Sequence, residues 1–134
     1  DIFKHVLAAS GASSAGIDAA IFDALQRKSR PDLDRLLEQL PAASGVGLRA
    51  LMDMHGDLSV LDRAEAELAA SAPGIRDSLR ELRELSSALG ARYPEVSLYV
   101  DLAELRGYRY HTGVVFAVYT QGLGEALARG GRYD

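Results

Sequence analysis

The sequence predicts an α+β fold, with helices in its longer first part and antiparallel strands at its end. Leucine and alanine recur at spacings of three or four through residues 1–92, and apolar residues alternate with polar ones after Pro94. Glycine-rich turn clusters interrupt the alternating part. A length of 134 residues suits one domain with its own core. We therefore expect a helical segment over residues 1–92 and antiparallel strands over residues 93–134.

Six helices are expected in the first segment, each from an apolar stripe that we assign to the core. In chain order, the stripes contain Ile2, Phe3, Val6 and Leu7; Ile17, Ile21 and Leu25; Leu33, Leu36, Leu37 and Leu40; Leu48, Leu51 and Met52; Leu58, Leu61 and Leu68; and Ile75, Leu79, Leu82, Leu85 and Leu89. Pro31 suits the first turn of the third helix, and Pro41 ends it. The fourth helix is expected to reach Gly56. Pro73 begins the sixth, and Gly90 is expected just past its end.

Three strands are expected in the second segment. Residues 96–102 alternate between apolar and polar side chains, and a longer strand is expected from Tyr108 to Val118. A turn cluster over residues 121–124 follows, after which residues 125–133 are expected to return as a third strand. Short connections between consecutive strands favour an antiparallel meander.

Composition excludes several kinds of site. The absence of cysteine excludes disulfides, zinc–thiolate sites and thiol nucleophiles. A formal net charge of -4 argues against a nucleic-acid-binding chain, whose footprint is usually basic. No serine stands in a His/Asp arrangement and no metal-spaced cluster is visible, so we expect no catalytic residue, no metal site and no cofactor. No apolar run approaches the roughly 20 residues of a membrane span, and we expect a cytoplasmic protein.

Two late segments carry the strongest functional signal. They read Arg-Gly-Tyr-Arg-Tyr-His-Thr-Gly-Val-Val-Phe from Arg106 and Gly-Gly-Arg-Tyr-Asp from Gly130. They resemble the histidine-recognition segments of the histidyl-tRNA synthetase catalytic fold, which read roughly Arg-Gly-Leu-Asp-Tyr-Tyr-Thr-Gly-Thr-Val-Phe-Glu and Gly-Gly-Arg-Tyr-Asp. The matching residues are Arg106, Gly107, Tyr110, Thr112, Gly113, Val115, Phe116 and all five residues of the second segment.

Three departures from this pattern are as informative as the matches. Arg109 stands where the family has an acid, His111 replaces the second tyrosine, and Ala117 replaces the glutamate. With these departures the chain resembles a paralogous family that has lost aminoacylation, the regulatory subunits of ATP phosphoribosyltransferase.

The resemblance implies a fold and a role. The strands would belong to the central antiparallel sheet of a class II synthetase-like fold, and residues 1–92 would be a helical insertion with a flanking core helix. The chain would be an internal fragment of a longer protein. That protein would be a non-catalytic subunit, required for activity and histidine feedback at the first step of histidine biosynthesis. It would form a hetero-oligomer with the short-form catalytic subunit, take histidine as an allosteric effector and bind no tRNA.

The resemblance also implies a histidine-like ligand pocket. Its candidate residues are Arg106, Tyr110, His111, Gly130, Gly131, Arg132 and Tyr133. A guanidinium can donate two parallel hydrogen bonds to a phosphate or carboxylate, and a tyrosine offers a flat wall and a hydroxyl. Because adjacent strand residues point to opposite faces, at most one of Tyr110 and His111 can point into such a pocket.

Plainer interpretations stay open. Arg106 could pair with Glu104 or Asp101, Tyr110 could pack near Tyr108, and the glycine pair could be a strand-end turn. Two other functions also stay open: a histidyl-tRNA synthetase that activates histidine with ATP, and a helical interaction domain fused to a small sheet.

Overall fold

The computed structural model describes residues 1–106 and 113–133, and its fold is α+β as the sequence predicts. The helices and strands are α1 (Ile2–Ser10), the 3₁₀ helix η1 (Ala12–Ala15), α2 (Asp18–Gln26), α3 (Arg30–Leu37), α4 (Val46–Asp53), β1 (His55–Gly56), α5 (Ser59–Leu68), α6 (Ile75–Arg92), β2 (Val100–Asp101), β3 (Val115–Val118) and β4 (Ala128–Gly131). The chain forms two compact units, Asp1–Ala103 and Glu104–Asp134.

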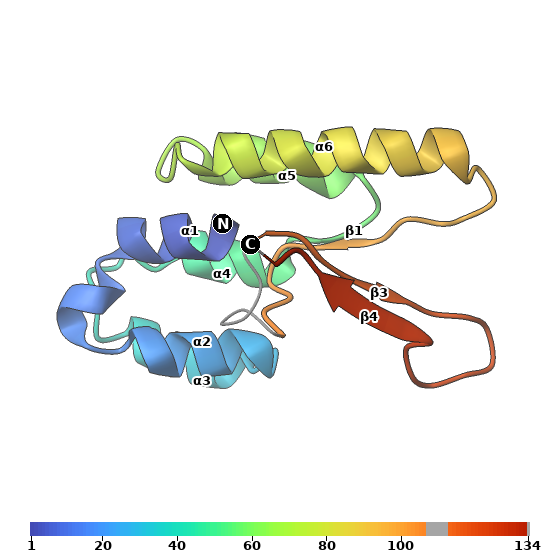
Figure 1. The fold of residues 1–134 in the computed structure, drawn as a ribbon. Helices are drawn as coiled ribbons and strands as arrows, with labels where there is room; N and C mark the ends of the chain where they lie inside the picture. The colour runs from blue at the N-terminus through green and yellow to red at the C-terminus, as the bar shows by residue number, and fades with distance from the viewer. Residues whose placement is uncertain (107–112, 134) are drawn as a thin grey trace. The chain divides into compact units, whose positions relative to one another are not determined.

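The first unit is a stack of three helix pairs. Helix α5 packs along α6, α1 packs against α4, and α2 packs against α3 (Figure 1). The α1–α4 pair joins the other two, since α4 contacts both α3 and α5 and α1 contacts α6. The predicted stripes supply most of this core, but the assignment to the core is wrong for Leu58, Leu85 and Leu89, which are exposed. The fully buried side chains of the core include Ile21, Leu25, Leu33, Leu48, Leu51, Met54, Leu61, Leu68, Ile75 and Leu79.

Three predicted helix ends are wrong. Helix α3 ends at Leu37, before the predicted stop at Pro41. Helix α6 continues through Gly90 to Arg92, because a glycine in a helix interior is unfavourable but does not stop it. The residue before Pro94 is disfavoured in the helical conformation, and Tyr93 has left it with φ -134° and ψ 67°. Helix α4 ends at Asp53 rather than at Gly56, because the next residues enter strand β1.

The predicted meander is also wrong in its first part. Strand β2 pairs antiparallel with β1, with His55 opposite Asp101 and Gly56 opposite Val100. The N–H of Leu102 extends the ladder by donating to the carbonyl of Met54 (2.9 Å). Because β1 lies between α4 and α5 and is only two residues long, it pairs with only part of the alternating segment at residues 96–102.

The second unit is built on the pairing of β3 with β4. These strands are antiparallel over four residue pairs, from Val115 opposite Gly131 to Val118 opposite Ala128. The predicted return of residues 125–133 as a strand is confirmed by β4, and β3 confirms the end of the predicted long strand. The earlier part of that strand includes residues 107–112, which lie outside the described part of the chain.

Across the described ranges 1–106 and 113–133, no helix is both long enough and apolar enough to cross a membrane.

Helix α6 offers a matched test of the core. Leu79 is 0% exposed and Leu85, on the same helix, is 41% exposed. We expect Leu79→Ala to lower the free energy of unfolding by about 2–5 kcal/mol, because it leaves a cavity in the helix stack. Leu85→Ala should change it by only about 0.5 kcal/mol. Urea denaturation of both variants and the parent measures the difference, and equal losses would contradict this packing.

Candidate functional site

The end of the first motif segment lies beside the second motif segment. The β3–β4 ladder places Val115 opposite Gly131 and Phe116 opposite Gly130. It extends one step further, because the N–H of Arg132 donates to the carbonyl of Val114 (3.0 Å). The structure therefore brings the predicted residues Gly130, Gly131 and Arg132 beside the end of the arginine–glycine segment.

Gly130 is required by a side chain of the opposite strand. A Cβ atom built on Gly130 would lie 2.8 Å from Cε1 and from Cζ of the Phe116 ring, closer than packed atoms approach. The ring thus covers the backbone of β4 at its cross-strand partner, an arrangement that stabilises a glycine in a strand. The group that approaches the backbone at Gly130 is therefore an aromatic ring of the same unit.

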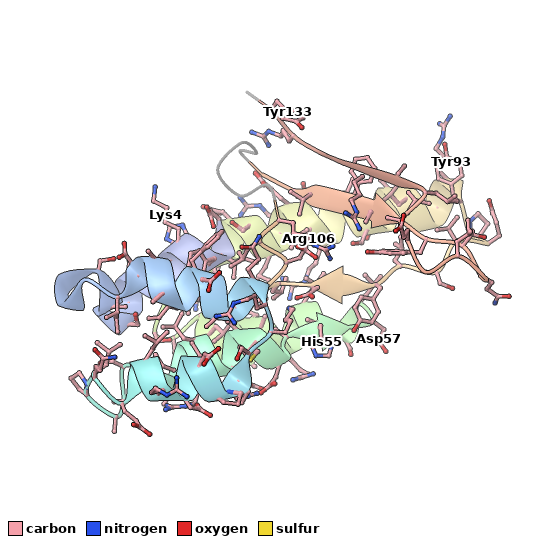
Figure 2. The ribbon with its side chains drawn as sticks, turned by 90° about the horizontal axis from the view of Figure 1, so that it is seen from below. Lys4, His55, Asp57, Tyr93, Arg106 and Tyr133 are labelled. Atoms are coloured by element: carbon pink, nitrogen blue, oxygen red, sulfur yellow. The ribbon has the colours of Figure 1, made fainter. Side chains whose placement is uncertain are left out.

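Arg132 lies next to Gly113, the last glycine of the first segment. A Cβ on Gly113 would be in ordinary contact with the arginine stem, 3.5 Å from its Cδ. The neighbouring Tyr133 is 69% exposed and is labelled in Figure 2. A side chain at position 113 would therefore touch the aliphatic part of Arg132 without a clash.

Arg106 is held by its near neighbour in sequence. Its Nε and Nη2 donate to the Glu104 carboxylate at 2.9 and 2.7 Å, and its backbone N–H donates to Glu104 Oε1 at 2.9 Å. The hydrogen bonds and charge of Glu104 raise the pKa of the Arg106 guanidinium, with a smaller contribution from Tyr119. Of the two partners that the sequence offers as a plain interpretation, Glu104 is thus the one observed.

Two of the seven candidate residues fall on the part of the chain that is not described. Tyr110 and His111 lie within residues 107–112, as does the departure at Arg109. Their roles, and the rule that only one of Tyr110 and His111 can face a pocket, stay predictions.

The departure at Ala117 falls on a described strand. Ala117 lies opposite Arg129 in the β3–β4 ladder. A glutamate there, as in the synthetase pattern, would stand across from a cation, and such cross-strand pairs are favourable by about 0.2–1 kcal/mol. The alanine therefore removes both an acid and a possible charge pair from this strand.

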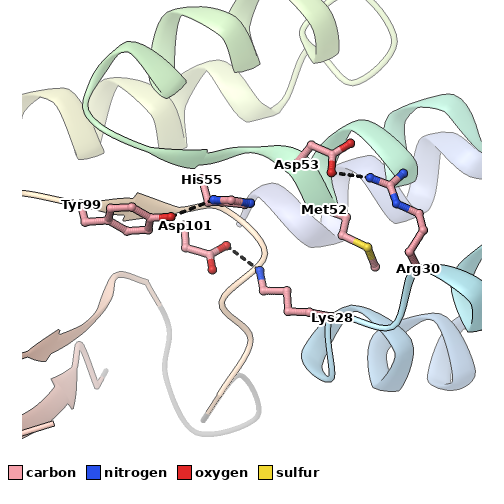
Figure 3. A pocket seen from close by; sticks show the side chains of 7 residues that line it. All are labelled: Lys28, Arg30, Met52, Asp53, His55, Tyr99 and Asp101. Carbon is pink, nitrogen blue, oxygen red and sulfur yellow. Dashed lines mark hydrogen bonds and ion pairs between the residues drawn. The ribbon is translucent and has the colours of Figure 1, made fainter. Parts of the chain in front are cut away.

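A separate cavity of about 450 Å³ opens in the first unit, and sequence reasoning did not predict it. It is lined by Lys28, Arg30, Met52, Asp53, His55, Tyr99 and Asp101. Three polar pairs cross it (Figure 3): Lys28 with Asp101 at 2.8 Å, Arg30 with Asp53, and the His55 Nδ1 with the Tyr99 hydroxyl at 2.8 Å. Each charged lining residue thus has a partner of opposite charge.

Among the residues that the structure describes, no group of three or more His, Cys, Asp or Glu side chains could hold a metal ion.

A double-mutant cycle tests the contact between Phe116 and Gly130. Gly130→Ala should destabilise the ladder, because the new methyl group displaces the ring, and Phe116→Ala should remove that clash. We therefore expect the double variant to lose less stability than the sum of the single variants, by about 0.5 kcal/mol or more. Gly124→Ala is the control, since nothing lies within 4 Å of its added Cβ. Strictly additive losses of unfolding free energy would contradict the contact.

Known proteins match this chain over almost its whole length. A family model described as histidyl-tRNA synthetase matches residues 1–134. Curated relatives named ATP phosphoribosyltransferase regulatory subunit align over 133 residues, or 99% of this chain. They are 46% identical in Azotobacter vinelandii strain DJ, 47% in Ectopseudomonas mendocina strain ymp and 44% in Pseudomonas aeruginosa strain LESB58.

The chain spans 33% of the first two relatives and 34% of the third, about a third of their length. No solved structure matches it. The family model covers every residue, including both motif segments that β3 and β4 bring together. The chain therefore belongs to the histidyl-tRNA synthetase family, with a class II synthetase-like α+β fold.

Proposed function

We propose that this chain is part of a non-catalytic regulatory subunit of ATP phosphoribosyltransferase, acting at the first step of histidine biosynthesis. The observation that carries the proposal is the 44–47% identity to proteins with that name, over 99% of the chain. Because the chain spans about a third of those proteins, the activity proposed is that of the longer protein.

The departures from the synthetase pattern support loss of aminoacylation. Arg109 and His111 introduce a cation and a titratable ring, and Ala117 removes an acid. If the face that carries them lines the ligand pocket, its charge is reversed relative to the synthetase pattern. Arg106, whose counterpart in the resembling synthetases faces the phosphate of the activated amino acid, already donates both arms of its fork to Glu104.

The proposed pocket is a sensor and not a catalytic centre. Histidine would bind among Arg106, Tyr110 or His111, and the segment from Gly130 to Tyr133. A carboxylate ligand can compete for Arg106, because its side chain is 55% exposed and surface ion pairs are worth little in water. Histidine would then act as an allosteric effector by binding two states of the complex with different affinity.

The proposed partner is the short-form catalytic subunit, in a cytoplasmic hetero-oligomer that does not act on tRNA. The rival function is a histidyl-tRNA synthetase, and the matching family model is the observation in its favour. The two differ in whether the protein forms an aminoacyl-adenylate.

An exchange assay separates these functions. We expect the purified full-length protein to show no histidine-dependent ATP–pyrophosphate exchange and no charging of tRNA, because the acids at positions 109 and 117 of the pattern are replaced. An authentic histidyl-tRNA synthetase assayed in parallel is the positive control. Robust charging by the full-length protein would contradict the regulatory proposal.

The role of Arg106 is tested by calorimetric titration of the full-length protein with histidine. If the guanidinium binds the ligand carboxylate, Arg106→Ala should weaken binding by about 10-fold or more, since a hydrogen bond to a charged group contributes about 1.5–3 kcal/mol. Glu104→Gln should not weaken binding, because it releases the fork for the ligand. Arg80→Ala, which removes a surface pair with Asp77, is the control. Unchanged affinity in Arg106→Ala would mean that Arg106 serves only its pair with Glu104.

A further inference from the structure

Lys28 adopts a backbone conformation that usually belongs to glycine. It has φ 54°, in the left-handed region, at the end of helix α2. The Lys28 N–H donates to the Leu25 carbonyl (3.0 Å) and the Ser29 N–H to the Ala24 carbonyl (2.9 Å), the hydrogen-bond pattern of a Schellman motif. Glycine is the commonest residue at this position because it has no Cβ to strain. A lysine at this position has a strained backbone, but its side chain can make contacts that glycine cannot make.

The Lys28 side chain reaches a residue 73 positions away. Its Nζ donates to Oδ1 of Asp101 at 2.8 Å, and the two side chains are 39% and 24% exposed. The same oxygen accepts the backbone N–H of Ala103 at 2.9 Å. Lys28 thus forms an ion pair with the carboxylate that also accepts the N–H of Ala103, the last residue of the first unit.

Residues 99–103 are bound to the helical unit at several other points. Asp101 pairs with His55 across the β1–β2 ladder, and the Leu102 N–H donates to the Met54 carbonyl. The side chains of Leu102 and Ala103 are buried, and the Tyr99 hydroxyl meets the His55 ring (Figure 3). The chain passes from this anchored segment into Glu104 and Arg106 without an intervening helix or strand.

We infer that Lys28 is a positioning residue: through Asp101, it fixes the point from which the Arg106 segment leaves the helical unit. The ligand-binding consequence rests on the proposed function, whereas the anchoring itself does not. No ligand contact by Lys28 is involved, so its effect on the pocket passes entirely through residues 101–103.

The substitution Lys28→Gly tests the role of the Lys28 side chain while keeping the backbone conformation. Lys28→Gly removes the ammonium group and relieves the left-handed strain, so the helix end stays intact. Asp101→Asn removes the charge but keeps an oxygen for the Ala103 N–H. Lys28→Arg keeps a cation and should restore parent behaviour. Lys4→Ala removes the chain's other lysine, which lies exposed on helix α1, and is the control.

The experiment is hydrogen exchange on the full-length protein, read at the amides of Leu102, Ala103 and Arg106. These amides donate to Met54, Asp101 and Glu104, so their exchange reports local opening. We expect Lys28→Gly and Asp101→Asn to increase the exchange rate at all three amides by about two- to fivefold. An effect of this size is expected from the loss of a half-exposed ion pair. Exchange at Ile21 should stay unchanged, and histidine affinity should fall by a similar factor.

Faster exchange at Leu102 and Ala103 with unchanged exchange at Arg106 would overturn the inference, because Lys28 would then have only a local structural role. Unchanged exchange at all three amides would also overturn it, as would normal histidine affinity in Lys28→Gly when the parent binds histidine. A parent protein that does not bind histidine would instead contradict the proposed sensor, and the exchange at Arg106 would still decide the role of Lys28.

Discussion

The antiparallel pairing of β3 with β4 is the constraint on which the proposed site depends. It sets the backbone of Gly130 and Gly131 against that of Phe116 and Val115, and it continues through the hydrogen bond from Arg132 to Val114. A slip of one residue would turn every side chain of a strand to the other face. The Phe116 ring lies over Gly130, and a residue with a Cβ at that position would clash with the ring.

The two units are stabilised in different ways. The helical unit buries apolar side chains from each of its paired helices, whereas the β3–β4 pair leaves Phe116, Val118 and Tyr119 exposed. A two-stranded pair is marginal by itself in water. The motif residues Phe116, Gly130 and Gly131 therefore lie on the less stabilised element.

How far the sequence predicts this structure depends on the range of the interactions involved. Helix positions follow from local periodicity, and Ile75 and Leu79 of the sixth predicted stripe are buried as expected, whereas Leu85 and Leu89 of the same stripe are exposed. The pairing of β2 with β1 could not be predicted, because it joins residues 45 or so positions apart and β1 has only two residues. Helix α6 extends past Gly90 and ends at Arg92, because Pro94 and not the glycine stops it.

The predictability of the sites also depends on the range of the interactions. The motif segments and the Arg106–Glu104 pair were accessible from the sequence, since one rests on resemblance and the other on two nearby opposite charges. The cavity around Lys28, by contrast, gathers residues from α2–α3, α4–β1 and β2 that only the folded chain brings together. Its charged pairs had no signature in any single stretch of sequence.

The central claim is that the longer protein regulates a catalytic partner and has no synthetase activity. It is tested most directly by adding the full-length protein to the short-form ATP phosphoribosyltransferase catalytic subunit and measuring phosphoribosyl transfer to ATP as histidine is titrated. The account predicts low activity for the catalytic subunit alone, a clear rise when the full-length protein is added, and inhibition of that rise by histidine. Activity that is the same with and without the full-length protein would contradict it.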